Sequence, residues 1–130
     1  GERVDEPSGG DFPANLTYVK DAANGIYLAY TTQKLKHRLF NLSSGRNYRI
    51  SEVARLIEEI VPGVEIRVGP GLGRGASLMT TSVRGPLAID RASRELSFRV
   101  QYALEEGLRE FAAWAKKQTF KEEGTKDRAG

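Results

Sequence analysis

Cysteine is absent from the 130 residues of this sequence, and histidine occurs once, at His37. Without cysteine the chain forms no disulfide and offers no thiolate to a metal. A single histidine does not supply the ligand set of a conventional zinc site, so we expect no metal centre. No apolar run approaches the roughly 18 residues of a membrane span, and no secretory signal is visible. These absences fit a soluble cytoplasmic protein.

A strong excess of charge of one sign is also missing. Twenty Lys and Arg stand against 17 Asp and Glu, which gives a formal net charge of +3. Because acids and bases alternate rather than cluster, we expect no nucleic-acid partner. A hydrophobic content of 39% allows one domain with a modest core. We expect a loop at residues 1–13, a folded lobe at 14–118 and a flexible tail at 119–130.

The first half of the lobe predicts a strand followed by a helix. Leu16–Val19 is a short, β-prone segment, and Asp21 is a good N-cap for a helix over Ala22–Lys34. Apolar residues at helical spacing predict its buried face. They are Ala22, Ala23, Ile26, Tyr27 and Tyr30.

The rest of the chain continues the alternation of strands and helices. A strand at 39–42 and a turn at 43–47 are predicted first, followed by a helix that Ser51 caps and that Pro62 and Gly63 stop. A strand at 64–68 and a helix from its cap Asp90 to Leu96 come next. The last predicted element is a helix at 104–118, whose buried residues are Leu104, Leu108, Phe111 and Ala115. The order predicts an α/β fold with about four helices. A sheet of such short strands is thin for a free-standing domain, which suggests that another body packs against it.

Two motifs resemble catalytic or cofactor sites. Tyr30 and Lys34 match the Tyr-x-x-x-Lys pair in which lysine activates a tyrosine base. No serine lies at the usual distance upstream, so we predict a core tyrosine followed by a surface lysine. The glycines of 69–75 alternate and do not match the Gly-x-Gly-x-x-Gly of a dinucleotide site. We predict a loop there, with a lid over an anionic ligand, using Arg74 or Arg84, as the functional alternative.

Other candidate groups have ordinary structural interpretations. His37 lies between Lys36 and Arg38, so we expect it to be a solvated surface residue. Asp21 and Asp90 are predicted to be helix caps rather than catalytic acids. The residues alone therefore predict no catalytic, cofactor-binding or metal site.

Five segments, in this order, resemble the NAD-dependent epimerase/dehydratase family, the extended short-chain dehydrogenases/reductases that act mainly on nucleotide sugars. They are Tyr18–Ala23, Phe40–Gly45, Ile50–Val53, Arg84–Phe98 and Tyr102–Trp114. The resemblance covers about residues 10–117 and implies the C-terminal, substrate-binding part of a Rossmann-like enzyme.

In that family an N-terminal lobe binds NAD and carries the catalytic Ser/Thr, Tyr and Lys. None of those motifs occurs here, so the resemblance implies a chain that is inactive alone. It also implies a nucleotide-sugar or other small-molecule substrate. Two alternatives remain: a related NAD(P)-dependent dehydrogenase or reductase lobe for a small substrate, and a non-enzymatic binding or oligomerisation module. Apolar surface left bare without the other lobe predicts a homo-oligomer.

The resemblance also yields the candidate substrate contacts. The family's Arg-Asp pair, whose arginine clamps a diphosphate, falls at Ala14 and Asn15, so that arginine is missing. Arg84 is the nearest equivalent of a second family arginine. Ser97 occupies a position where the family usually has glycine. The predicted substrate-binding residues are Arg84, Asn15 and Arg74.

Overall fold

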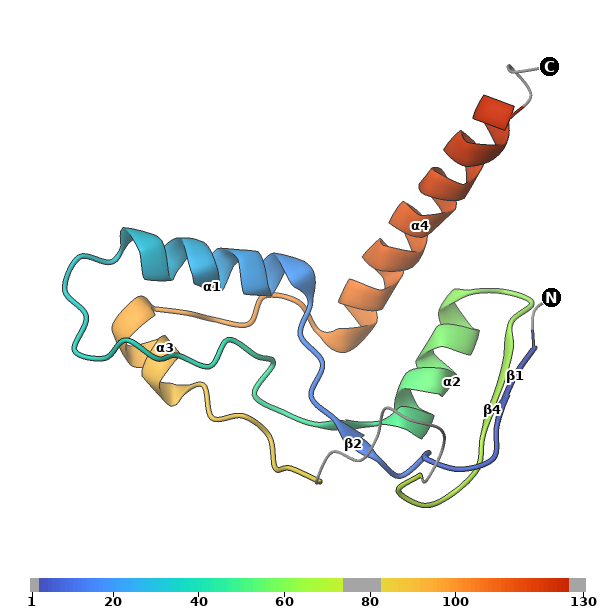
Figure 1. Ribbon diagram of the computed structural model, residues 1–130, viewed down its shortest axis with the longest axis horizontal. Coiled ribbons are helices and arrows are strands. Elements are labelled where there is room, and N and C mark those ends of the chain that lie inside the picture. The colour runs from blue at the N-terminus through green and yellow to red at the C-terminus, as the bar shows by residue number, and fades with distance from the viewer. Residues whose placement is uncertain (1–2, 74–82, 127–130) are drawn as a thin grey trace.

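A computed structural model describes residues 3–73 and 83–126, with side chains as far as residue 118. The described residues form a small α/β fold, as predicted, with four helices and short strands (Figure 1). In chain order these are β1 (Arg3–Glu6), β2 (Pro13–Ala14), α1 (Val19–Thr31), β3 (Tyr48–Arg49), α2 (Ile50–Ile60), β4 (Glu65–Val68), α3 (Asp90–Leu96) and α4 (Leu104–Lys126).

The strands form two separate two-stranded sheets. β1 pairs in parallel with β4, and Val4 lies opposite Ile66. β2 pairs antiparallel with β3, and Ala14 lies opposite Tyr48. The predicted strand at 64–68 is therefore confirmed. The expected loop at 1–13 is wrong in part, because residues 3–6 form β1 and Pro13 begins β2.

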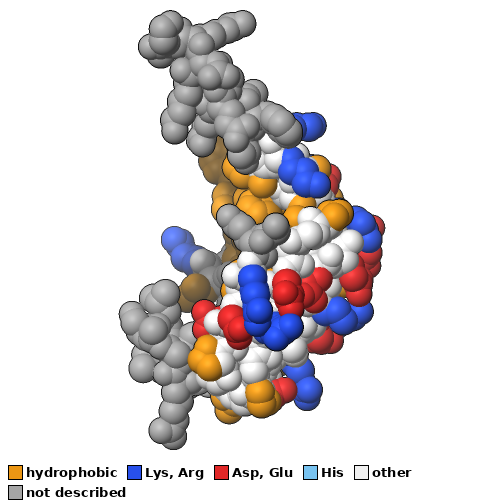
Figure 2. Space-filling view, turned by 90° about the vertical axis from the view of Figure 1, so that its right-hand side faces the viewer, with side chains coloured by type: hydrophobic (Ala, Val, Ile, Leu, Met, Phe, Trp, Pro, Cys, Tyr) orange, Lys and Arg blue, Asp and Glu red, His pale blue; other side chains and the backbone are white. Residues whose placement is uncertain are grey.

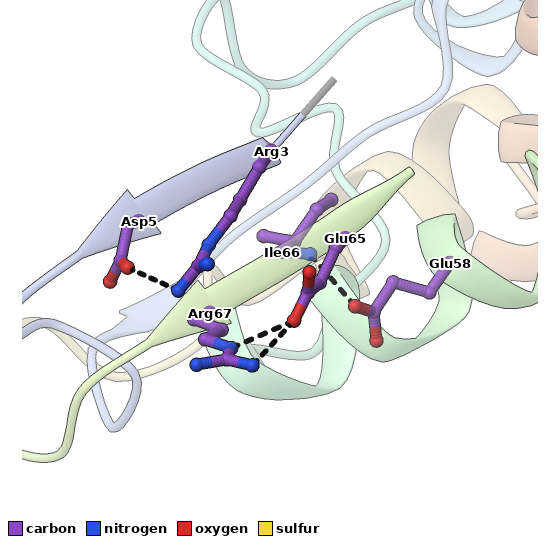
Figure 3. Close-up of polar contacts among 6 residues, drawn as sticks. All are labelled: Arg3, Asp5, Glu58, Glu65, Ile66 and Arg67. Carbon is purple, nitrogen blue, oxygen red and sulfur yellow. Dashed lines mark hydrogen bonds and ion pairs between the residues drawn. The ribbon is translucent and has the colours of Figure 1, made fainter. Parts of the chain in front are cut away.

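Helix α2 is fastened to the edge of β4 (Figure 3). A Glu58 carboxylate oxygen accepts a hydrogen bond from the Ile66 N–H at 2.7 Å. Exposed ion pairs join Arg3 to Asp5 at 3.0 Å and Arg67 to Glu65 at 2.7 Å. Exposed pairs of this kind contribute little to stability. This end of the molecule serves as a scaffold.

The core lies between α1, α3 and the irregular segment 35–42. Ala92, Leu96 and Phe98 are buried at its centre. The partly buried residues packed around them are Leu28, Ala29, Leu35, Phe40 and Leu42. The expected strand at 39–42 is wrong, because its apolar side chains enter this core from irregular backbone. The expected strand at Leu16–Val19 is also wrong, since α1 already begins at Val19.

Asp21 is buried, with a relative exposure of 2%, and anchors the segment before α4. Its carboxylate accepts hydrogen bonds from the N–H groups of Gln101, at 3.0 Å, and Tyr102, at 3.3 Å. The prediction that Asp21 caps α1 is wrong: Tyr18 occupies the N-cap position and Asp21 lies in the first turn. The carboxylate satisfies backbone donors from a distant segment instead.

The predicted buried face of α1 is wrong in its orientation. Ile26 and Tyr27 are exposed, and Tyr30, expected in the core, is 88% exposed. The face turned inward carries the buried Asp21 and Gly25 and the partly buried Leu28. Both faces of α1 contain apolar residues, so periodicity alone did not identify the one that packs.

The other three helices lie where the sequence predicts them, but their ends differ from the predicted ends. α2 begins at Ile50 after Arg49, so Ser51 is not its cap. The helix ends at Ile60, just before the predicted stop. Asp90 is the first residue of α3 rather than its cap. α4 continues to Lys126, beyond the predicted end at Gln118.

The predicted buried stripe of α4 is only partly buried. Leu104, Leu108 and Ala115 are half-buried, whereas Phe111 is exposed. Trp114 is 56% exposed, and its ring stacks on that of Phe111 with centroids 5.8 Å apart. This part of α4 therefore presents aromatic surface to solvent.

Ser97, at the C-cap of α3, has a left-handed backbone conformation with φ 57° and ψ 24°. A side chain makes this conformation unfavourable, by roughly 1–2 kcal/mol in regular backbone. Glycine, which lacks a Cβ, adopts this conformation without that penalty.

We predict that Ser97→Gly stabilises the chain by about 0.5–1 kcal/mol, because relief of strain outweighs the greater backbone entropy of glycine in the unfolded state. Urea unfolding measures the change. Ser97→Ala, which keeps the Cβ, is the matched control and should bring no gain. Equal stability of the Ser97→Gly variant and the original chain would contradict the prediction.

Candidate functional site

A groove of about 350 Å³ is formed by segments that are far apart in the sequence. β2 and its flanking residues form one wall, the turn before β3 contributes Asn47, and the segment before α3 contributes the other wall. The lining residues are Phe12, Pro13, Ala14, Asn15, Asn47, Arg84, Gly85 and Leu87. Two of the predicted substrate-binding residues, Asn15 and Arg84, thus line one groove. The third, Arg74, lies outside the described residues.

A chain of side-chain amides holds the walls of the groove together. Asn15 Nδ2 donates to the Arg46 carbonyl oxygen at 3.0 Å and to Asn47 Oδ1 at 3.3 Å. Asn47 Nδ2 donates in turn to the Arg84 carbonyl oxygen at 2.8 Å. Sequence reasoning missed Asn47, because asparagine in a turn is ordinary and its partner Arg84 lies 37 residues away.

The chemistry of the groove is that of a binding site. Its described lining residues are apolar ones, two asparagines and one arginine, Arg84. Mostly apolar walls with a few placed polar groups are typical of small-molecule pockets. Among the described lining residues there is no carboxylate, histidine, lysine or tyrosine to transfer a proton. The arrangement can bind and orient a ligand, and an arginine pairs well with an anionic group.

A second polar cluster joins the start of α1 to α4. The Tyr18 hydroxyl donates to a Glu110 carboxylate oxygen at 2.6 Å, and Lys20 Nζ lies 2.7 Å from the same oxygen. The hydrogen bonds from Lys20 and Tyr18 lower the pKa of Glu110. The hydrogen bond to Glu110 raises the pKa of both Tyr18 and Lys20. A catalytic tyrosine base would need a lowered pKa, so this cluster serves as a link between helices.

Aromatic packing supports the same link. The rings of Tyr18 and Tyr102 lie 4.8 Å apart, and Lys20 Nζ is 5.6 Å from the centre of the Tyr102 ring. Gly107 faces Tyr18 so closely that an added Cβ would lie 2.9 Å from a ring carbon. A hollow of about 430 Å³ beside this cluster is lined by Gln101, Tyr102, Glu106 and Glu110.

No family model and no curated protein matches this sequence. Several solved structures do match. The UDP-glucose 4-epimerase from Thermotoga maritima, solved with UDP-glucose, superposes with a TM-score of 0.70 at 20% identity, over 91% of this chain and 36% of its own. The enzyme MoeE5, in complex with UDP-glucuronic acid and NAD, gives 0.69 at 19% identity, over 91% of this chain and 38% of its own.

A third match carries a superfamily name. A short-chain dehydrogenase/reductase superfamily protein from Agrobacterium tumefaciens, solved with NAD, gives a TM-score of 0.57 at 21% identity, over 95% of this chain and 35% of its own. The chain therefore has the fold of part of a short-chain dehydrogenase/reductase. It spans a little over a third of the length of these proteins.

The described glycines of the 69–75 stretch do not form a dinucleotide-binding turn. A dinucleotide pyrophosphate needs a glycine-rich turn that opens a helix. Here the Gly10 N–H donates to the Gly69 carbonyl oxygen at 2.9 Å, and a Cβ at Gly69 would lie 2.0 Å from the Pro7 carbonyl oxygen. Gly69 thus allows two backbone segments to pack, and residues 69–73 form no helix.

His37 lies at the surface, as predicted, but it has a partner that the sequence did not indicate. Its Nδ1 contacts the Glu95 carboxylate of α3, which also accepts the N–H groups of Lys36, at 3.1 Å, and His37, at 3.2 Å. Desolvation opposes ionisation of Glu95, yet the hydrogen bonds from His37 and Lys36 prevail and lower its pKa. The pair ties the segment after α1 to α3.

In the described part of the chain, no three His, Cys, Asp or Glu side chains gather as metal ligands would. The helices in the same residues are too short or too polar to cross a bilayer.

Proposed function

We propose that this chain is the substrate-binding part of an NAD-dependent sugar-nucleotide epimerase or dehydratase, inactive without a cofactor-binding lobe. The groove that brings together Asn15 and Arg84 is the observation that carries the proposal. Two proteins with the same fold were solved with UDP-glucose and with UDP-glucuronic acid and NAD, which supports a nucleotide-sugar ligand. A cytoplasmic setting belongs to the same proposal.

In this proposal NAD supplies hydride chemistry from the other lobe, and the residues of this chain hold the substrate. Arg84 pairs with an anionic group of the ligand. Asn47 fixes the backbone of Arg84, and Asn15 fixes Asn47. Phe12 and Leu87 exclude water from the ligand on the two walls. The described residues of the groove provide no proton-transfer group, so catalysis falls to the other lobe.

The other lobe would cover apolar faces of α1 and α4. The exposed residues are Val19, Ile26, Tyr27 and Tyr30 on α1, and Phe111 and Trp114 on α4. Tyr27 follows Lys20 by two helical turns, and Trp114 follows Glu110 by one. Because Lys20 contacts Glu110, we infer that Tyr27 and Trp114 lie on the sides of α1 and α4 that border the angle between these helices. Exposed apolar surface of this kind marks a contact site.

The face bearing α2, β1 and β4 differs from these helix faces (Figure 2). Acidic and basic side chains are interspersed over it, while apolar side chains gather toward α4. We therefore propose that the cofactor lobe, or a second copy of this chain when that lobe is missing, packs against α1 and α4. Such pairing would produce the expected homo-oligomer.

One observation favours a second candidate function, a dehydrogenase or reductase lobe for a small substrate. Among the described lining residues the groove has one cationic group, and Ala14 lies where a second arginine would clamp a diphosphate. A smaller ligand with fewer charges would need no more than this.

Thermal unfolding with ligands tests the proposal. We predict that UDP- or dTDP-sugars raise the melting temperature of the chain by several degrees, whereas NAD leaves it unchanged, because binding to the folded state alone stabilises it. A rise with a small sugar or hydroxy acid, and none with nucleotide sugars, would support the second candidate. A rise with NAD alone would contradict the proposal, and no rise with any ligand would favour a non-enzymatic module.

Sedimentation tests the contact surface. We predict that the chain alone self-associates at tens of micromolar and that Tyr30→Glu shifts it toward monomer, because a charge on the contact face is desolvated on association. Leu39→Glu is the matched control, since Leu39 is 77% exposed and belongs to neither helix. A monomer at high concentration, or equal effects of the two substitutions, would count against this surface.

A further inference from the structure

We propose that the outer edge of β1 pairs in antiparallel fashion with β1 of a second copy of this chain, so that two β1–β4 sheets join into one sheet of four strands. This edge lies at the end of the molecule formed by β1 and β4, whereas the proposed contact surface lies on α1 and α4 (Figure 1). The inference goes beyond the proposed function, because it uses neither the groove nor the helix faces.

The backbone of β1 leaves one of its two edges open. The Glu6 carbonyl oxygen accepts the Gly69 N–H at 2.8 Å, so the backbone groups of Glu6 point toward β4. Because the backbone groups of successive strand residues point to opposite edges, those of Val4 also face β4, and those of Arg3 and Asp5 face outward. Among the described residues β1 pairs with β4 alone, and all four of its residues are exposed. The outward N–H and C=O groups are those that a further strand would bind.

The opposite edge of the same sheet is closed. The Ile66 N–H of β4 points away from β1 and donates to the Glu58 carboxylate of α2 at 2.7 Å (Figure 3). Glu58 thus takes the place of a strand on that side of β4. Two parallel strands are also few, since parallel sheets are generally larger and covered on both faces. In the described part of the chain, β1 is therefore the edge at which this sheet can grow.

Charge selects the register in which two copies of β1 can pair. In an antiparallel pair, residues whose backbone groups face the other strand stand opposite one another, so Arg3 and Asp5 meet only each other or themselves. Registers centred on Arg3 or on Asp5 place like charges opposite, which is unfavourable. The register centred on Val4 places Arg3 opposite the partner's Asp5, and Asp5 opposite the partner's Arg3. Two copies related by a two-fold axis are therefore complementary in charge.

Val4 supplies an apolar contact at this axis. It is 44% exposed, and in this register it meets its own copy in a pair without hydrogen bonds, where Cα atoms are about 4.5 Å apart. β-branched side chains this close across two strands pack together. Beyond Arg3 the sequence continues with Glu2, and a like charge opposite Glu6 would confine the pairing to residues 3–5. Such a short interface predicts a weak, concentration-dependent dimer.

Reversing one charge at a time tests this register. Asp5→Arg makes both paired positions positive and Arg3→Asp makes both negative, so each variant repels its own copy. A mixture of the two variants brings opposite charges together at both pairs. Every sample also carries Tyr30→Glu, so that association through the proposed contact surface does not contribute. Sedimentation equilibrium compares the samples at about 300 μM, a concentration that detects a weak dimer.

We expect the chain with Tyr30→Glu alone to dimerise weakly, each charge reversal to weaken this dimer at least about tenfold, and the mixture to recover it. The exposed Arg3–Asp5 ion pair contributes little to stability, so the reversals should leave the melting temperature unchanged. Arg55→Glu is the matched control. It makes the same change of net charge as Arg3→Asp at an exposed position of α2, and it should leave dimerisation unchanged.

Three results would overturn the inference. A chain with Tyr30→Glu alone that stays monomeric at this concentration would show that the edge of β1 does not pair. A dimer that survives both charge reversals would place the contact elsewhere. Two reversals that abolish the dimer without recovery in the mixture would reject the register centred on Val4. None of these results bears on the proposed function, whose tests use ligands and the faces of α1 and α4.

Discussion

The buried carboxylate of Asp21 determines how the two ends of this fold meet. By accepting the N–H groups of Gln101 and Tyr102, it holds the segment after α3 against the first turn of α1. That placement brings the ring of Tyr102 onto Tyr18 and starts α4 where Glu110 reaches Lys20. A carboxyl group buried at this position is tolerated because backbone donors satisfy it, and its loss would leave those donors unpaired. The angle between α1 and α4 therefore depends on Asp21 together with the contacts of Glu110 to Tyr18 and Lys20.

The two proposed functional surfaces follow from this arrangement. Figure 1 shows β2, which forms one wall of the groove, at the lower edge of the molecule, while α1 and α4 diverge above it. The groove is suited to a small ligand, because apolar residues and one arginine line it. The helix faces are suited to a folded partner, because large apolar side chains lie exposed there. The proposed ligand site and the proposed contact surface thus occupy different parts of the same chain.

Local patterns predicted the elements that are governed by local interactions. The end of α2 was predicted correctly from Pro62 and Gly63. Strand β4 was predicted from the alternation of apolar residues over 64–68. Strand β1 was not predicted from the sequence. Its residues are exposed and mostly charged, and they pair with a strand about 60 residues away, so no local pattern indicates a strand. The face of α1 was misassigned because the choice between two apolar faces depends on tertiary packing. Asn15 and Arg84 were found through resemblance to a family, whereas Asn47 became visible only when three distant segments met.

We propose above all that the apolar faces of α1 and α4 form the contact surface for a cofactor-binding lobe. Trp114 is the only tryptophan in the chain and lies on this surface, so its fluorescence reports directly on contact there. The most direct measurement is acrylamide quenching of Trp114 in the dilute chain and in a polypeptide that joins this sequence to such a lobe. We expect acrylamide to quench Trp114 readily in the dilute chain and only weakly in the joined polypeptide. Equal quenching of Trp114 in both would contradict the proposed contact surface.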